Sequence, residues 1–452
     1  MQHKIYLQNT LGKEKQEFIP IDPKEIKMYS CGPTVYNYAH IGNLRAYVFA
    51  DTLKRVLKYN GFDVKHIMNI TDVGHLTSDA DNGDDKMVKA LKREGKEMNL
   101  ENMRSVANFY FEAFKTDLEK LNIELPNAFP FASDHIKEDE EMIQTLLDKD
   151  FAYKTTDGIY FDTTKDSDYG RLGGIGDDET HGRIESNTEK KNYRDFALWK
   201  FADGTGLGFE APFGNGFPGW HIECSAMVEK YLGTPIDIHT GGIDHIPVHH
   251  NNEIAQTECA TGHNLANFWM HNAHITIGED KMAKSGDNFL TLETLSKNGI
   301  HSLAYRYWLL TARYSTRVDY SLEAIKSAQV AYEKLQAHLN SLGDGHGTIN
   351  TEYKVRFIEA INNDLDTPKA LAITWELVKD TEINNADKKA TLTDFDKVLG
   401  LMLGSVIKEN KEIPEVVQKL IEERKLAREN KDWIKADELR KQIQDAGFEI
   451  KD

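Results

Sequence analysis

The sequence predicts a doubly wound α/β domain that carries an inserted subdomain and is followed by a helical bundle and a small C-terminal segment. Three observations support this prediction. Short extended stretches alternate with amphipathic helices near the N-terminus, a second α/β segment spans residues 235–277, and every substantial segment after Ser302 has helical periodicity. Because the chain has 452 residues, it is too long for one ordinary hydrophobic core, and several domains are expected.

The N-terminal part of the α/β domain is predicted as a strand, a helix and a second strand. Residues 27–30 are a short extended stretch that leads into a turn at Cys31. Apolar residues at helical spacing predict a helix over residues 41–59, which ends at Asn60-Gly61. Residues 63–70 then have the composition of a strand. This order is typical of a parallel sheet with crossover helices.

The rest of the chain divides into segments of different character. Helices are predicted over 100–121 and 136–149, whereas the polar, Gly-rich stretch 158–186 predicts an irregular insertion. The helices expected after Ser302 lie at 303–311, 322–342, 352–363, 368–380 and 390–403, with two more from 413 onwards that are split near residues 430–431. The predicted segments are 1–130 (first half of the α/β domain), 131–215 (inserted connective subdomain), 216–290 (second half), 291–320 (joint), 321–404 (helical bundle) and 405–452 (small C-terminal segment).

The composition is that of a soluble globular protein, with 40% hydrophobic and 28% charged residues. We expect no membrane span, because no apolar run is long enough to cross a bilayer, and no secretory signal at the N-terminus. Three scattered cysteines do not form a disulfide framework, which indicates a reducing, cytoplasmic setting. The net charge of −18 is weak evidence against a nucleic-acid partner, since a local basic strip can still bind a phosphate backbone.

Two short motifs have the residue types needed to bind a nucleoside triphosphate. His40-Ile-Gly42-Asn43 lies where a turn meets a helix N-terminus, whose free N–H groups and positive dipole end attract phosphates. Lys281-Met-Ala-Lys284-Ser285 places two lysines in one loop, which suits the charge that develops on a leaving pyrophosphate. Taken singly, the first motif is better explained by a chance helix start and the second by an exposed basic loop.

A metal site is the third candidate. Cys31, Cys224, His249 and Glu253 offer two sulfurs, one imidazole nitrogen and one carboxylate oxygen, which is a reasonable set for zinc. His249 and Glu253 stand at i and i+4 in a helical segment and therefore share a face. His250 with Glu253, at i and i+3, is an alternative pair. The cysteines are too far apart in the sequence to identify the site alone, and each could be an ordinary buried thiol.

Several motifs resemble those of one enzyme family. The two nucleotide-site motifs are similar to the HIGH and KMSKS signatures of the class I aminoacyl-tRNA synthetases, with Asn43 in place of the second histidine and Ala283 in place of a serine. Stretches that resemble the cysteine-specific members of this class cover nearly the whole chain, and they begin at Cys31, Asp195, Pro218, Asp237, His249, Phe268, Asn363 and Asp432. One departure is Ile246-Pro-Val-His-His, where the family more usually has Phe-Pro-His-His.

The resemblance implies a Rossmann-type catalytic domain with cysteine–tRNA ligase activity, in which cysteine reacts with ATP and is then transferred to the 3′ end of tRNA(Cys). It implies one zinc ion per chain, held by the four residues named above, and ATP used with Mg²⁺. The implied roles of individual residues are catalysis by His40, Asn43, Lys281 and Lys284, ATP binding by His40, Gly42, Asn43, Gly241, Gly242 and Lys284, and cysteine binding by Thr71, Trp220, His239 and Asp244.

The implied partners are tRNA(Cys), cysteine and ATP, with no membrane and no DNA. The helical bundle and the C-terminal segment would then lie on the anticodon side, and a cationic stretch at the joint suits an RNA stem; its members are Lys281, Lys284, Lys297, Arg306, Arg313 and Arg317. A ligase that transfers cysteine to an amino sugar would share the zinc and nucleotide motifs, but a small acceptor does not require the long helical half. A non-catalytic RNA-binding relative is disfavoured because His40, Lys281 and Lys284 are all present.

Overall fold

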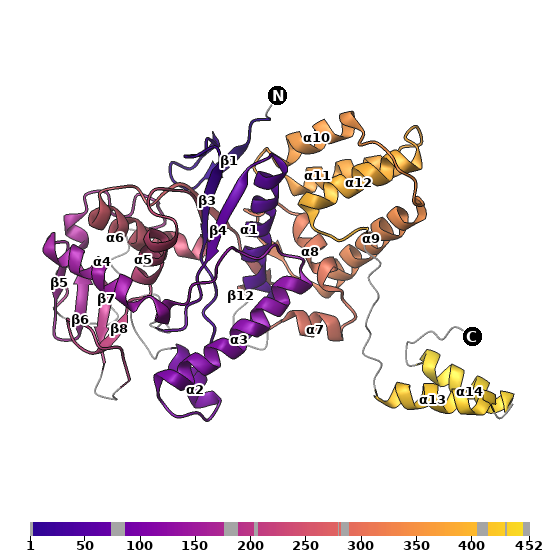
Figure 1. Ribbon diagram of the computed structural model, residues 1–452, viewed down its shortest axis with the longest axis horizontal. Coiled ribbons are helices and arrows are strands. Elements are labelled where there is room, and N and C mark those ends of the chain that lie inside the picture. The colour runs from indigo at the N-terminus through magenta and orange to yellow at the C-terminus, as the bar shows by residue number, and fades with distance from the viewer. Residues whose placement is uncertain are drawn as a thin grey trace. The chain divides into compact units, whose positions relative to one another are not determined.

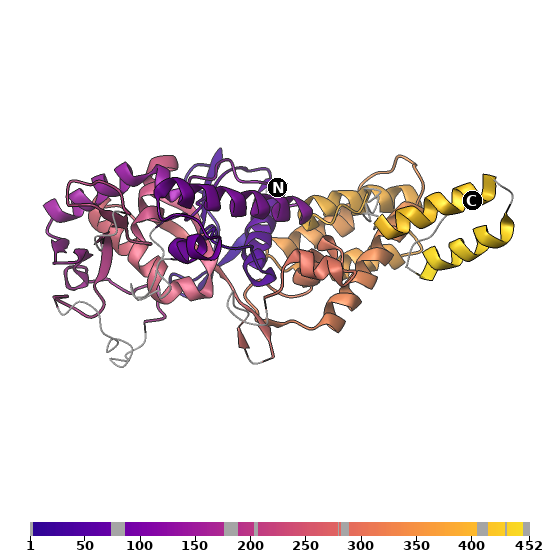
Figure 2. The same cartoon turned by 90° about the horizontal axis from the view of Figure 1, so that it is seen from below.

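The computed structural model describes residues 3–73, 86–175, 189–202, 207–278, 280–281, 289–404, 415–429 and 432–445 (Figures 1 and 2). The chain forms two compact units, Met1–Gly404 and Ser405–Asp452. Among the described helices, none combines the length and the apolar composition needed to span a bilayer.

The centre of the first unit is a parallel sheet in the order β10-β9-β3-β4. Its strands are β3 (Glu25–Ser30), β4 (Asp63–Met68), β9 (Ile236–Gly242) and β10 (Ala266–Asn272). Helix α1 (Ile41–Tyr59) connects β3 to β4, and α6 (Asn251–Thr261) connects β9 to β10. The chain therefore winds outward in both directions from the adjacent strands β3 and β9, which confirms the doubly wound prediction. Ligands in such sheets bind beyond the carboxyl ends of these two strands.

The inserted subdomain is more regular than the sequence predicts. Strands β5 (Ala152–Lys154), β6 (Gly158–Phe161), β7 (Phe196–Phe201) and β8 (Gly216–Pro218) form an antiparallel sheet in sequence order. Apolar side chains of β6 and β7, such as Phe161, Phe196 and Trp199, pack into a core with α4 (Ile136–Asp148) and α5 (Ile222–Tyr231). The prediction of an irregular segment over 158–186 is therefore wrong for its first residues, and residues 176–188 lie outside the described part of the chain.

The other elements of the first unit surround the central sheet. The strands are β1 (Tyr6–Asn9), β2 (Glu14–Glu17), β11 (Ile275–Ile277), β12 (Asp280–Lys281) and β13 (Val318–Asp319). The helices are α2 (Lys86–Arg93), α3 (Leu100–Lys120), α7 (Leu292–Lys297), α8 (Ser302–Leu310), α9 (Leu322–Ser341), α10 (Thr351–Ile361), α11 (Thr367–Lys379) and α12 (Asn385–Leu399). In the second unit α13 (Glu415–Glu429) and α14 (Trp433–Asp445) share a small core that includes Ala427, Ala436 and Leu439.

Most helix boundaries agree with the sequence prediction, and α12 differs most. It begins at Asn385, because the side chain of Asn384 caps its N-terminus by accepting a hydrogen bond from the Asp387 N–H. It ends at Leu399, because Gly400 adopts a left-handed φ of 64°. A side chain is also excluded at Gly400 by space, since a Cβ atom there would lie 2.5 Å from Arg306 Nη2.

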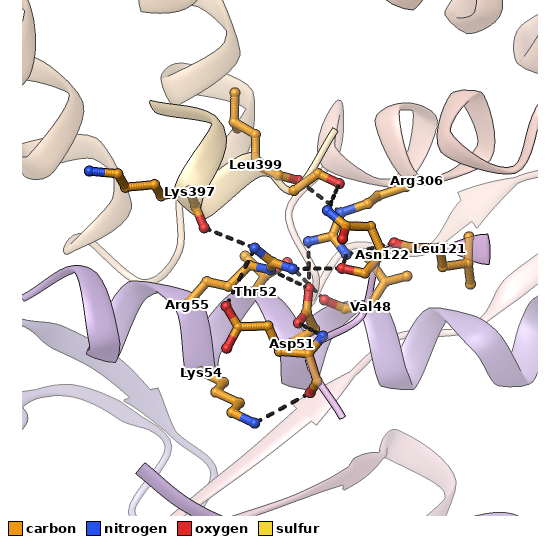
Figure 3. Close-up of polar contacts among 12 residues, drawn as sticks. Val48, Asp51, Thr52, Lys54, Arg55, Leu121, Asn122, Arg306, Lys397 and Leu399 are labelled. Carbon is orange, nitrogen blue, oxygen red and sulfur yellow. Dashed lines mark hydrogen bonds and ion pairs between the residues drawn. The ribbon is translucent and has the colours of Figure 1, made fainter. Parts of the chain in front are cut away.

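A buried charge cluster joins α1 to the helical bundle (Figure 3). Arg306 of α8 is fully buried, with Nη2 2.6 Å from Asp51 Oδ2, and it donates hydrogen bonds to the carbonyls of Leu121 and Leu399. Asp51 also accepts a 2.8 Å bond from Arg55 Nε, and Arg55 donates to the Lys397 carbonyl. The prediction that Arg306 contributes to an RNA-facing surface is therefore wrong, because its charge is used inside the protein to hold α8 and the end of α12 against α1.

Candidate active site and metal centre

The first nucleotide-site motif forms the start of α1. His40 is the N-cap residue, and its Nδ1 accepts a 3.0 Å hydrogen bond from the Asn43 N–H. The Asn43 side chain completes a capping box by accepting from the His40 N–H. Because Nδ1 accepts, a neutral His40 ring carries its proton on Nε2 and can donate it to a bound group. Asn43, where the family has histidine, therefore has a structural role at the helix start, and Gly42 is the second residue of the helix.

The lysine motif leads back to the same place. The backbone of Lys281 pairs with Thr276 in the β11–β12 ladder, whereas Lys284 lies outside the described residues. After the motif, the chain returns to α1, where the Leu290 carbonyl accepts a 2.8 Å hydrogen bond from the Ile41 N–H. The ring of Phe289 also stands edge-on to His40, with 6.1 Å between centroids. The two sequence motifs thus flank one region at the start of α1.

The four predicted metal ligands come from four separate elements and converge. Cys31 follows β3, Cys224 lies in α5, His249 lies in a π-helical turn (Ile246–His250), and Glu253 lies in the first turn of α6. All four are buried, and their donor atoms lie within 4.8 Å of one another. Donors around a tetrahedral zinc, at roughly 2.0–2.3 Å from the metal, stand about 3.3–3.8 Å apart. The arrangement therefore has the donor chemistry and nearly the size of a zinc site.

The charges of this cluster favour a cation. The pKa of Cys224 falls to about 6, chiefly because Cys31 donates a hydrogen bond to its sulfur and His249 adds to the effect, although burial acts in the opposite direction. Burial would raise the pKa of Glu253, but His239 and His249 outweigh it and hold the pKa below its ordinary value. Burial would lower the pKa of His249, but Glu253 and Cys224 raise it to about 10. The buried cluster therefore favours a positive charge at its centre, which a bound metal ion would supply in place of the proton.

The geometry distinguishes the two candidate histidines. His249 Nε2 lies 2.7 Å from Glu253 Oε1, while its Nδ1 lies 2.8 Å from His221 Nδ1, so that the ring is oriented by a partner on its far side. His250 Nε2 lies 4.0 Å from the same carboxylate and 3.2 Å from Cys31 Sγ. Cys31, His239, His250 and Glu253 also form a possible metal-binding group, but only the set with His249 includes both cysteines.

The predicted cysteine-binding residues surround this cluster at different depths. The ring of Trp220 stacks on His249, with 4.3 Å between centroids. His239 is fully buried and hydrogen-bonded to Glu253 Oε2 at 2.7 Å, so it orients a predicted ligand. Thr71 is buried, with its hydroxyl accepting from Asn69. Asp244 is the most accessible of the four, with 43% of its side chain exposed.

Gly241 and Gly242 end β9, beside the histidines. A Cβ atom at Gly241 would lie 2.6 Å from the ring of His250, and one at Gly242 would lie 2.4 Å from Asp244 Oδ1. The absence of a side chain at these positions thus lets the His250 ring and the Asp244 carboxylate approach the strand end. Gly32, which the sequence does not single out, has the tightest packing, since a Cβ atom there would lie 1.6 Å from the Asn69 carbonyl oxygen.

Fold and site together define a class I aminoacyl-tRNA synthetase. Residues 17–330 match the family model for tRNA synthetases class I (C) catalytic domain, residues 356–407 match the DALR domain, and residues 410–452 match the cysteinyl-tRNA ligase anticodon binding domain. The chain belongs to the cysteine–tRNA ligase family. It is 45% identical over 453 residues to cysteine–tRNA ligase 1 of Burkholderia lata, which covers 99% of this chain and 95% of that protein, and 41% identical over 492 residues to the Treponema denticola enzyme, with 99% and 98% coverage.

Solved structures of other synthetases share the fold. A Mycobacterium tuberculosis methionyl-tRNA synthetase bound to methionyl-adenylate superposes with a TM-score of 0.57 at 15% identity, covering 84% of this chain and 90% of that one. A leucyl-tRNA synthetase complex of Agrobacterium radiobacter gives a TM-score of 0.61 at 11% identity, with 86% and 85% coverage. At such low identity these similarities establish the architecture only.

Proposed function

We propose that this chain activates cysteine with ATP, releases pyrophosphate, and transfers cysteine to the 3′ end of tRNA(Cys). One observation carries the proposal: two buried cysteines, a histidine and a glutamate converge beside the carboxyl ends of β3 and β9 in a class I synthetase fold. Homologous proteins that match almost the full chain are cysteine–tRNA ligases. A site rich in sulfur ligands is suited to the recognition of a substrate thiol.

We infer that Cys31, Cys224, His249 and Glu253 hold one zinc ion. When bound, zinc supplies a Lewis-acid site that prefers a thiolate to an alcohol, which separates cysteine from serine more strongly than shape alone can. His239 and His221 support the site, because they orient Glu253 and His249 through hydrogen bonds of 2.7 Å and 2.8 Å. The stacked ring of Trp220 would limit the space for the substrate side chain.

For the remaining roles, the structure supports some of the assignments by placement. His40 can donate from Nε2 to the nucleotide at the start of α1, where Gly42 and the helix dipole also favour phosphate. Lys281 and Lys284 are proposed to stabilise the pyrophosphate as it leaves, with ATP bound as its Mg²⁺ complex. Gly241 and Gly242 are proposed on the ATP side, and Thr71 and Asp244 as partners of the cysteine ammonium group.

The domain assignment follows the same interpretation. We propose that residues 1–130 and 216–290 form the catalytic domain, with 131–215 inserted, and that 291–320 joins it to the anticodon-side segments 321–404 and 405–452. The DALR and anticodon-binding matches at 356–407 and 410–452 support tRNA as the acceptor and disfavour a small acceptor such as an amino sugar. Three free cysteines are consistent with the cytoplasmic location that we propose.

A pair of assays tests the proposal. ATP–pyrophosphate exchange measures activation, and transfer of labelled cysteine to a tRNA(Cys) transcript measures charging. We expect both with cysteine and neither with serine. Exchange with cysteine that is followed by transfer to an amino sugar instead of tRNA would overturn the choice of acceptor, and the absence of cysteine-dependent exchange would overturn the activity itself.

A further inference from the structure

Helix α2 presents a strongly cationic face in an otherwise acidic protein. Its eight residues include Lys86, Lys89, Lys92 and Arg93 and no acidic residue, although the chain has a net charge of −18. Met87, Ala90 and Leu91 form its buried face, and α2 packs against α3. Because the apolar stripe is buried, the lysines at 89 and 92 and Arg93 are exposed.

An aromatic cluster lies next to this helix. The rings of Tyr38, Phe109 and Tyr110 meet edge-to-face, with centroids 5.1–6.2 Å apart. Tyr110 is buried, but Tyr38 is 42% exposed and Phe109 is 59% exposed. Large aromatic rings at such exposure do not stabilise a core, and their faces are available to a partner.

Arg93 connects the cationic helix to the aromatic cluster and to the catalytic segment. Its Nη2 donates 2.6 Å and 2.9 Å hydrogen bonds to the Tyr36 carbonyl and to the Tyr110 hydroxyl. Glu94 accepts from the Tyr110 hydroxyl at 2.7 Å and from Arg93 Nε, so it neutralises part of the local charge. Arg93 thereby ties α2, which also carries the exposed Lys89 and Lys92, to the aromatic cluster through Tyr110. We call the surface formed by Tyr38, Phe109, Lys89, Lys92 and Arg93 the α2–α3 platform.

The platform adjoins the approach to the active site. Tyr36 and Tyr38 lie on the segment between Cys31, a proposed metal ligand, and His40, the N-cap of α1. In both views α2 and α3 lie outside the central sheet as a pair of neighbouring helices (Figures 1 and 2). An elongated substrate whose end reaches His40 can therefore rest on this surface.

We propose that the α2–α3 platform binds the unpaired 3′ end of the tRNA, with a base stacked on Phe109 or Tyr38 and phosphates near Lys89 and Lys92. The inference rests on the proposed function, which makes tRNA the acceptor. Exposed rings and cations on neighbouring elements are features that bind single-stranded nucleic acid, because every base has a π-face and every linkage carries a negative charge. The rival occupant is a second copy of this acidic chain. Its negative charge would suit the cationic face of α2, but that attraction does not account for the two exposed rings.

The test compares full-length tRNA(Cys) with a transcript that lacks its last three nucleotides. The variants are Phe109→Ala, Phe109→Tyr, and the pair Lys89→Glu with Lys92→Glu. Tyr193→Ala, at a site where the ring is 48% exposed, is the aromatic control. Lys24→Glu is the charge control, because Lys24 precedes β3 at the opposite end of the strand from Cys31.

We expect Phe109→Ala to weaken binding of the full-length tRNA about tenfold, as for loss of one stacked base, and Phe109→Tyr to restore it. Binding of the trimmed transcript and ATP–pyrophosphate exchange should stay unchanged, and the charge-reversed pair should lower the salt dependence of binding. Three results would overturn the assignment of the platform to the 3′ end. They are equal losses of affinity for both transcripts, no loss of affinity for either, and a change in the molecular mass of the protein by light scattering. A wild-type protein that charges no tRNA would instead overturn the proposed function, which is a separate outcome.

Discussion

Replacing Arg306 by methionine should destabilise the first unit by about 4 kcal/mol. The guanidinium is fully buried and holds Asp51 Oδ2 at 2.6 Å, and it donates to the carbonyls of Leu399 and Leu121 at 2.8 Å and 3.0 Å. Removing one partner of such a pair costs about 3–5 kcal/mol, because the other charge stays buried with less compensation. In the variant, Asp51 still has Arg55 as an ion-pair partner at 2.8 Å. Because its charge stays partly compensated, the expected loss of stability lies within this range and not above it.

Urea unfolding measured by tryptophan fluorescence gives this free energy, and Trp308 in α8 reports on the affected helix. Asp51→Asn combined with Arg306→Met should cost at least about 1 kcal/mol less than the sum of the two single changes, since the same pair is removed twice. Arg317→Met is the matched control at an exposed arginine, where a change within about 0.5 kcal/mol is expected. An Arg306→Met variant within about 1 kcal/mol of wild type, or strictly additive double-variant energies, would refute the proposed brace.

Three further predictions concern pH and the active site. Burial lowers the pKa of His66 to about 3, with Lys54 adding to the effect and Asp51 opposing it. Because the unfolded state then binds one more proton below pH 6.5, the free energy of unfolding should fall with decreasing pH. Between pH 7 and 5, wild type should lose about 2 kcal/mol more than His66→Gln in urea unfolding. Lys284→Ala should slow pyrophosphate exchange at least tenfold with little change in the KM for cysteine; an unchanged kcat with a raised KM would be contrary to its assigned role. Cys224→Ser should abolish both zinc binding and cysteine activation, whereas Cys259→Ser should leave metal content and exchange near wild type, as elemental analysis and exchange assays can show.

The local elements of this fold could be predicted from sequence because local patterns determine them. Apolar spacing and a helix stop identify α1 to the residue, and its cap is visible in the motif that starts at His40. Helix α2 is not identified from the sequence, since only eight residues separate Asp85 from Glu94 and so short a segment shows no clear apolar periodicity. Strands β5 to β8 are not identified from the sequence either. Strands β5 and β6 form a local hairpin, but each has only three or four residues, which is too short for a clear alternation. Strand β7 pairs with β6 across a long polar and Gly-rich stretch, and no local pattern indicates that pairing.

The site was predictable in its parts but not in its packing. The pairing of His249 with Glu253 follows from helical spacing. Although His249 lies in the π-helical turn before α6, the two side chains are still in contact at 2.7 Å. The resemblance placed His239 in this site as a cysteine-binding residue, but its hydrogen bond to Glu253 could not be deduced. The contact of His221, the N-cap residue of α5, with His249 could not be deduced either, because no sequence pattern links those elements. The same limit applies to Asp51 and Arg306, which are far apart in the chain and meet only when the bundle folds back onto α1.

X-ray absorption at the zinc edge, recorded on the purified protein with and without cysteine, tests the proposed recognition of the substrate thiol. The four-residue site predicts one zinc per chain with two sulfur ligands from Cys31 and Cys224, at roughly 2.3 Å. Addition of cysteine should raise the number of sulfur ligands to three, and addition of serine should leave it at two. A protein that lacks stoichiometric zinc yet activates cysteine, or a spectrum that cysteine does not change, would contradict selection of the thiol by this metal site.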